Sequence, residues 1–201
     1  MQRKTASAAS FWLTATKTKM KAKNIDKEVE LPEGVEVAVE GRFVKVSGPK
    51  GELELSLRNS LVELIKEDRR VKVIAKKIAK RQKTDLNTFV AHLKNAIKSV
   101  QEGHTYRLKI CSGHFPMNVS SSGKEFVVKN LFGEKVPRML KLKEGVDVKV
   151  DGEIVTVTGN NKAITGQVAA DIEQLTRRPG YDHRIFQDGI YIIEKDGKEL
   201  R

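Results

Sequence analysis

Few residues of this 201-residue chain have the types and spacing that catalysis or metal binding requires. The reactive candidates are one cysteine and four histidines: His92, His104, Cys111, His114 and His183. Cys111 and His114 stand three positions apart, but no third group is evident that would orient the histidine as a base. The histidines also lack the spacing of metal ligands. We therefore predict no catalytic residue, no metal and no other cofactor, and we expect Cys111 to be a buried strand residue.

The charge of the chain is more informative than these reactive residues. There are 38 Lys and Arg against 26 Asp and Glu, with a formal net charge of +12 and a pI near 9.7. This excess favours an anionic partner. Nucleic acid ranks ahead of anionic lipid, because no long apolar segment and no amphipathic basic helix is present. The alternative is a positive surface that only keeps the protein soluble.

Basic residues gather in three stretches of the chain. Residues 69–83 hold eight positive charges and no acidic residue, and we take Lys76, Lys77, Arg81 and Lys83 as candidate phosphate contacts. The alternative for this stretch is a solvated strand edge that lysine keeps soluble. The second stretch comprises Lys135, Arg138, Lys141 and Lys143.

The third stretch, from Arg177 to Arg184, combines arginines with flat side chains. Arginine donates to phosphate through a planar fork, and unpaired bases or ribose can stack on tyrosine and histidine. The candidate RNA contacts here are Arg177, Arg178, Tyr181, His183 and Arg184. The same residues could instead cap the preceding helix or pack against it.

The elements that position these residues come from an internal duplication. Residues 34–48 (GVEVAVEGRFVKVSG) recur 111 positions later as residues 145–159 (GVDVKVDGEIVTVTG), with eight identities in fifteen positions. Because two repeats are too few for a solenoid, each copy must belong to its own small domain. We predict a first domain at residues 26–103, a second at 104–195 and a short tail at 196–201.

Each copy reads as a β-hairpin that is followed by a helix. Alternating valines predict the hairpin strands, with turns at Glu40-Gly41 and Asp151-Gly152. The segment 48–51 (GPKG) resembles a phosphate loop in composition alone and is expected to be a turn, before further strands at 53–57, 61–65 and 71–75.

Apolar spacing predicts one long helix in each domain. The first begins at an N-cap on Thr84 and ends at Gly103, and the second begins at Asn161 and ends at 179–180 (PG). Strands through 106–110 and 126–128 complete the second domain. The fold class is α+β, with two similar duplicated domains that each pack one long helix on a face of an antiparallel sheet.

Residues 1–25 hold six basic residues and no acidic one, which predicts a disordered basic N-terminal arm or extension. Their apolar run from Ala8 to Leu13 is too short to span a membrane. A targeting peptide, or a start of the protein at Met20, are the alternatives.

Two further segments carry a resemblance to a known family. Residues 130–135 (NLFGEK) and 184–195 (RIFQDGIYIIEK) resemble the archaeal and eukaryotic form of the large-subunit ribosomal protein L-six family. The spaced Arg, Phe, Asp-Gly, Tyr and Lys of the closing segment are specific for it. The resemblance spans Val29 to Lys195 and leaves residues 1–19 outside.

This resemblance implies a structural role in the cytoplasmic large ribosomal subunit, without catalysis, membrane contact or a small-molecule substrate. The implied partners are large-subunit ribosomal RNA near the stalk base and the factor-binding region, and neighbouring large-subunit proteins. In that family the second domain makes most of the RNA contact, which adds three segments by position: 114–118, 135–141 and 177–184. Within them we assign His114, Phe115, Asn118, Lys135, Arg138 and Lys141 besides the residues above.

Two alternatives remain open at this point. The loop residues Phe115 and Met117 could plug the core instead of contacting RNA. The whole chain could be a tandem protein-interaction module, whose sheet edges add a partner strand and whose charge keeps it soluble.

Overall fold

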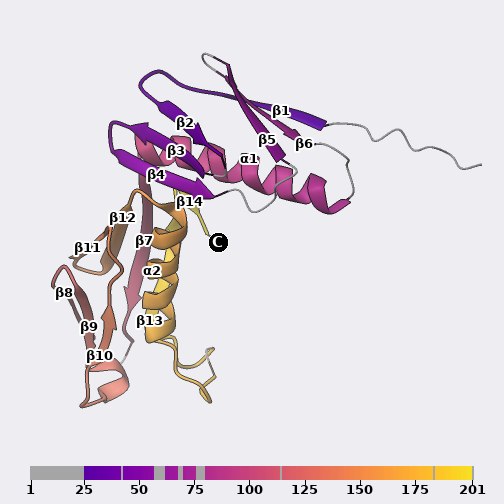
Figure 1. Cartoon of the computed structure of the whole chain (residues 1–201). Helices are drawn as coiled ribbons and strands as arrows, with labels where there is room; N and C mark the ends of the chain where they lie inside the picture. Colours follow the sequence, from indigo (N-terminus) through magenta and orange to yellow (C-terminus); the bar gives the residue numbers. More distant parts are fainter. Residues whose placement is uncertain are drawn as a thin grey trace, which may run out of the picture.

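The computed structural model describes residues 25–41, 43–56, 62–67, 70–75, 80–113, 115–182 and 184–200. The chain forms two lobes, which meet where α1 (Lys80–Gln101) passes into β7 (His104–Cys111) (Figure 1). Each lobe has its own hydrophobic core. The predicted α+β class is confirmed. The predicted arm at 1–25 lies outside the described residues except for Ile25, as do Lys76, Lys77, His114 and His183.

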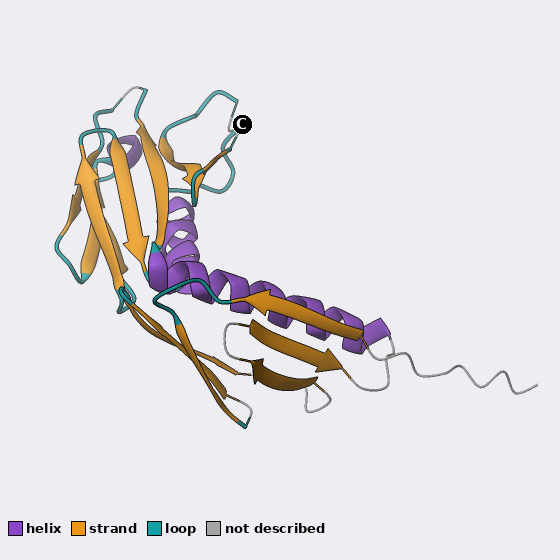
Figure 2. Ribbon diagram, turned by 90° about the horizontal axis from the view of Figure 1, so that it is seen from above, coloured by secondary structure: helices purple, strands orange, loops and turns teal. Residues whose placement is uncertain are grey.

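The first lobe packs α1 against two small antiparallel sheets. One sheet has the order β2-β3-β4, and the other has the order β1-β6-β5. Figure 2 shows α1 running along these strands. The strands are β1 (Ile25–Glu30), β2 (Glu36–Glu40), β3 (Phe43–Gly48), β4 (Gly51–Ser56), β5 (Val62–Glu67) and β6 (Arg70–Ala75).

The second lobe packs α2 (Lys162–Leu175) against a five-stranded sheet with the order β11-β12-β7-β13-β14. A second sheet, β10-β9-β8, completes its core with the buried side chains of Phe126 and Val128. The remaining elements are β8 (Asn118–Ser121), β9 (Glu125–Lys129), the 3-10 helix η1 (Leu131–Gly133), β10 (Arg138–Lys141), β11 (Val146–Asp151), β12 (Ile154–Gly159), β13 (Gly189–Lys195) and β14 (Lys198–Glu199).

Both copies of the repeat form the predicted hairpin, but the turns lie one position further along. Glu40 pairs with Phe43 and Asp151 pairs with Ile154, so each acidic residue still belongs to its strand. Gly41 and Gly152 begin the turns, with φ angles of 62° and 58°. Glycine takes this left-handed conformation at low cost, which makes it the favoured first residue of a type II′ turn.

A second glycine of the repeat is required by close packing. A Cβ atom on Gly48 would lie 2.8 Å from Cγ2 of Val100 in α1. A Cβ atom on the equivalent Gly159 would lie 3.1 Å from the carbonyl oxygen of Gly145 and closer still to Thr165 in α2. In both lobes, therefore, the hairpin ends at a glycine that lets its backbone approach a neighbouring element.

The helix ends agree with the prediction at two of four places. Gly103 is left-handed with φ 75° and donates to the carbonyl oxygen of Ser99, and the Asn161 side chain caps α2 by accepting from two backbone N–H groups. The N-cap at Thr84 is wrong: α1 begins at Lys80, and the Thr84 hydroxyl donates back to the Lys80 carbonyl oxygen at 3.1 Å from inside the helix. The helix α2 also ends early, at Leu175.

Candidate nucleic-acid interface

Three segments that are distant in sequence meet at one end of the second lobe. The Asn130 side chain, just before η1, donates to the carbonyl oxygen of Pro116 at 3.0 Å. The Phe115 ring packs over Gly133, where it would lie 3.6 Å from a Cβ atom. The third segment, which follows α2, joins them through Arg138. We call this end of the lobe, formed by the described residues within 112–118, 130–138 and 176–188, the loop end.

Arg138 links the segments of the loop end through four hydrogen bonds. Its guanidinium donates to both carboxylate oxygens of Glu134, at 2.7 and 2.9 Å, in a forked ion pair. Its third nitrogen donates to the carbonyl oxygens of Leu175 at 2.7 Å and Arg177 at 3.1 Å. The hydrogen bond from Arg138 holds the pKa of Glu134 below its ordinary value, more than burial raises it. The guanidinium thus links β10 to the C-terminal end of α2.

Three aromatic rings and an arginine cover the loop end. Phe132 and Tyr181 have ring centroids 6.2 Å apart at 29°, and Phe186 meets Tyr181 edge-on at 5.0 Å. The Arg178 guanidinium carbon lies 4.1 Å from the Tyr181 centroid and 5.4 Å from the Phe132 centroid. These distances fit cation–π contacts. We call Phe132, Arg178, Tyr181 and Phe186 the aromatic cluster.

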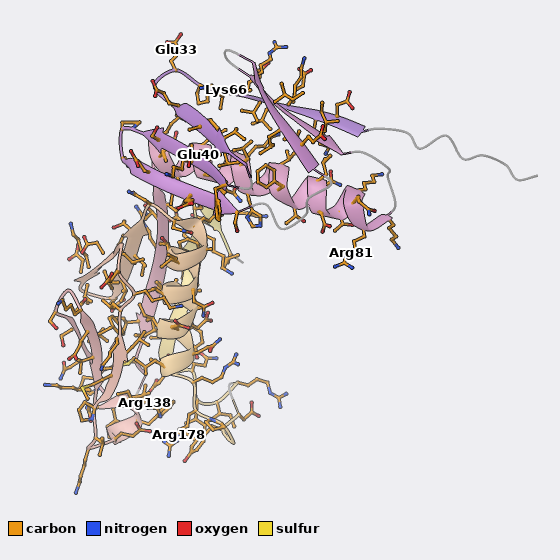
Figure 3. All side chains as sticks on the ribbon, viewed as in Figure 1. Glu33, Glu40, Lys66, Arg81, Arg138 and Arg178 are labelled. Carbon is orange, nitrogen blue, oxygen red and sulfur yellow. The ribbon has the colours of Figure 1, made fainter. Side chains whose placement is uncertain are left out.

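Part of this cluster rests on unusual backbone geometry. Asn130 and Phe132 have φ angles of 61° and 51°, in the left-handed region that costs free energy for residues other than glycine. Gly133 follows with φ 78°. The short helix η1 therefore turns tightly enough to present the Phe132 ring to Tyr181 and Phe186. Figure 3 shows the labelled Arg138 and Arg178 near each other at this end.

The structure brings most of the predicted RNA contacts of the second domain to this lobe's surface. Side chains that are exposed are Phe115, Asn118, Lys135, Lys141, Arg177, Tyr181 and Arg184. Arg178 and Arg138 are half-buried. The fork of Arg184 contacts Asp182 at 3.1 and 3.2 Å, yet its side chain is 90% exposed. Met117 packs half-buried against the second core, as the core alternative predicted for it.

The two predicted contacts of the first domain that the structure describes, Arg81 and Lys83, lie far from the loop end. Arg81 and Lys83 are exposed in the first turns of α1. In Figure 3 the labelled Arg81 stands far from Arg138 and Arg178. Among the described residues, therefore, the predicted contacts lie on two separate surfaces rather than one.

A chain of three side chains that sequence reasoning missed lies where the lobes meet. The Ser99 hydroxyl is 2.8 Å from Nε2 of His104, and Nδ1 of His104 is 2.9 Å from a carboxylate oxygen of Asp196. The order resembles that of a serine hydrolase. However, Ser99 and His104 are each 1% exposed, and Ser99 also hydrogen-bonds the Asn95 carbonyl oxygen at 2.7 Å. A substrate cannot reach this hydroxyl, so the chain is a structural one.

Asp196 links the two lobes where α1 passes into β7. Besides His104 it binds Lys98 of α1 at 3.3 Å and Lys162 of α2 at 3.5 Å. Burial alone would raise the pKa of Asp196, but the hydrogen bonds and charges of His104 and Lys98 outweigh it and hold the pKa below its ordinary value. With a φ of 54°, Asp196 turns the chain between β13 and β14. We call this group the interlobe clasp.

Other kinds of site find little support in the described part of the chain. No group of three or more His, Cys, Asp or Glu among the described residues could hold a metal ion. None of the described helices is long and apolar enough to cross a bilayer. Cys111 ends β7 and is half-buried, not buried as predicted, because it lines a pocket beside the aromatic cluster.

Comparisons with known proteins agree with this arrangement. The family model of ribosomal protein L6 matches residues 31–103 and again residues 115–189. The large ribosomal subunit protein uL6 of Sulfurisphaera tokodaii is 42% identical over 178 residues, which cover 88% of this chain and 96% of that protein. The uL6 protein of Methanococcus vannielii is 45% identical over 176 residues, with coverage of 88% and 97%. The chain therefore belongs to the ribosomal protein L6 family.

Proposed function

We propose that this protein is a structural component of the large ribosomal subunit, which binds large-subunit ribosomal RNA and stabilises its tertiary fold. We place it near the stalk base and the factor-binding region, beside neighbouring large-subunit proteins, as the resemblance of its sequence implies. It makes and breaks no covalent bond. Membership of the ribosomal protein L6 family and the names of its relatives support the subunit assignment.

The observation that carries the RNA proposal is the composition of the loop end. Arg178 lies over the rings of Phe132 and Tyr181, and Arg177 lines the same pocket as these rings. Arg184 is exposed in the loop between Tyr181 and Phe186. Phosphate takes forked hydrogen bonds from arginine, and unpaired bases stack on aromatic rings. Protein-interaction surfaces are also rich in arginine and aromatic side chains, so the net charge of +12 is what favours RNA over a protein partner.

The mechanism follows from the distance between the two basic surfaces. Lys135, Lys141, Arg177 and Arg184 would neutralise phosphates at the second lobe, while Arg81 and Lys83 would do so at the start of α1. The interlobe clasp holds the two surfaces at a set spacing. RNA helices that repel one another could then be kept side by side, with specificity coming from their shape.

A salt titration tests this proposal. The protein would be mixed with large-subunit ribosomal RNA transcribed in vitro, and binding measured by filter retention between about 50 and 200 mM salt. Six to ten phosphate contacts predict a fall in affinity of about three to five orders of magnitude over that range. Affinity that does not change with salt would contradict the proposal and favour the tandem protein-interaction module.

A further inference from the structure

A pocket of about 410 Å³ opens beside the aromatic cluster. It lies within the size range of small-ligand sites, about 300 to 1,000 Å³. Phe132, Tyr181 and Phe186 supply flat apolar walls, and Arg177 and Arg178 supply donors. A single planar, polar group would suit walls of this kind.

The pocket also contains two carboxylates, which is unexpected on a surface that meets a polyanion. Glu173 and Asp188 both line it. One oxygen of Asp188 accepts from the backbone N–H of Gly113, but no described residue donates to or pairs with the carboxylate of Glu173. Both carboxylates affect the neighbouring Tyr191. Burial is the main cause that raises the pKa of Tyr191, and the charges of Cys111, Asp188 and Glu173 raise it further. A ligand that donates hydrogen bonds would satisfy these oxygens.

We propose that this pocket receives one unstacked guanine base of the RNA, an inference that rests on the RNA contact proposed above. Guanine carries two N–H donors on its Watson–Crick edge, which match a carboxylate such as that of Glu173. Its O6 and N7 acceptors match an arginine fork, here that of Arg177. Adenine, cytosine and uracil lack that pair of adjacent donors. The plane of the base stacks on the surface formed by Phe132, Tyr181 and Arg178.

The decisive variant is Glu173→Gln, because two accounts of the pocket predict opposite signs. If the carboxylate only repels phosphate, its removal strengthens binding to large-subunit ribosomal RNA. If it accepts from guanine, the same change weakens binding, by roughly tenfold. Since no described residue pairs with this carboxylate, the thermal unfolding of the variant should match that of the wild type. Unchanged or tighter binding overturns the proposal.

A pair of variants at Tyr181 tests the stacking. Tyr181→Phe keeps the ring and should bind the RNA like the wild type. Tyr181→Leu removes it and should weaken binding by about five- to a hundredfold, the range for one stacked base. Equal binding by the two variants overturns the stacking.

Chemical probing identifies the base itself. Kethoxal modifies the Watson–Crick edge of unpaired guanines, and dimethyl sulfate modifies adenine and cytosine. We expect one guanine that wild type and Tyr181→Phe protect from kethoxal and that Tyr181→Leu and Glu173→Gln leave reactive. Protection of an adenine or cytosine in its place overturns the assignment. Salt-dependent binding of the full-length protein without protection of any guanine from kethoxal also overturns it. If the wild type itself does not bind the RNA, it is the proposed function that fails.

Discussion

The two lobes share a hairpin and a helix but complete their sheets from different parts of the chain. In the first lobe β3 takes its second neighbour from β4, which follows it, and three strands separate the hairpin from α1. In the second lobe β12 takes its neighbour from β7, which precedes it, and α2 begins almost directly after β12. The hairpin and the helix are thus common to both lobes and form what we call the duplicated frame (β2, β3 and α1; β11, β12 and α2), whereas the strands around them differ.

The surfaces of the lobes differ more than their frames. The start of α1 offers Arg81 and Lys83 on a regular helix. The loop end offers Arg178 among aromatic rings, an arrangement that the described residues of the first lobe do not show. Under the proposed function, the duplicated hairpin and helix would supply rigidity and the added segments would supply recognition.

The largest effect should come from removing two arginines of the loop end. We expect Arg177→Ala with Arg184→Ala to lower affinity for large-subunit ribosomal RNA by roughly thirtyfold near 0.15 M salt, because each lost phosphate contact costs about fivefold there. The matched control is Arg81→Ala with Lys83→Ala, which removes two charges from α1 and should cost less. Filter binding measures both. Equal losses would mean that charge alone matters and that the aromatic surroundings do not.

Thermal unfolding separates binding from folding in this comparison. Both arginines of the loop-end pair are exposed, so their loss should leave the transition within about 0.5 kcal/mol of the wild type. If the Arg177→Ala and Arg184→Ala substitutions unfold the lobe instead, these arginines have a structural role.

The next largest effect concerns the interlobe clasp. Asp196→Asn removes the charge that His104, Lys98 and Lys162 share, and should lower the free energy of unfolding by about 2 kcal/mol. Denaturant unfolding measures the loss. Glu199→Gln, an exposed carboxylate on β14, is the control and should have no measurable effect.

The clasp also predicts how stability depends on pH. Because the pKa of Asp196 is lower in the folded protein than its ordinary value of 3.8, its contribution is complete above that value and is lost as the pH falls through the folded pKa. The wild type should therefore lose stability below about pH 4 by a larger amount than Asp196→Asn does. Identical acid profiles for the two proteins would contradict this role.

The smallest expected effect distinguishes two roles for Arg138. Arg138→Lys keeps the charge but cannot make the forked pair with Glu134 together with the bonds to Leu175 and Arg177, so it should lower stability by about 1 kcal/mol and weaken RNA binding indirectly. Lys141→Arg, also on β10, is the control. If the unfolding and the RNA binding of Arg138→Lys both match those of the wild type, the forked contacts are dispensable and only the positive charge at this position matters, as a phosphate contact would require.

Local rules were enough to predict the frame from the sequence. The valine alternation marked β2, β3, β11 and β12, and Asn161 and Gly103 marked helix ends, since each feature depends on residues close in the chain. The strand β1 was missed: Val29 is the one buried residue among its described side chains, and the strand owes its conformation to pairing with β6. Thr84 was misread because a hydroxyl serves a cap and a helix interior alike.

The candidate site was predicted in pieces but not as a whole. Arg177 and Tyr181 were found by their types, whereas Phe132 and Phe186 entered only through the family signature. The contact between these side chains depends on the left-handed backbone of Phe132 and on the hydrogen bonds of Arg138. No local sequence pattern predicts either feature. The clasp was missed for the same reason, since Ser99, His104 and Asp196 come from a helix, a strand and a turn, the last of them distant in sequence.

The most direct test of the whole account is a map of the crosslinks between this chain and RNA in purified large subunits. Ultraviolet crosslinking followed by mass spectrometry would identify the peptides that touch RNA. We predict that most crosslinks fall on peptides within residues 112–118, 130–141 and 176–188, with a smaller set at the start of α1. Crosslinks confined to the first lobe, or a chain that never sediments with large subunits at any salt concentration, would contradict it.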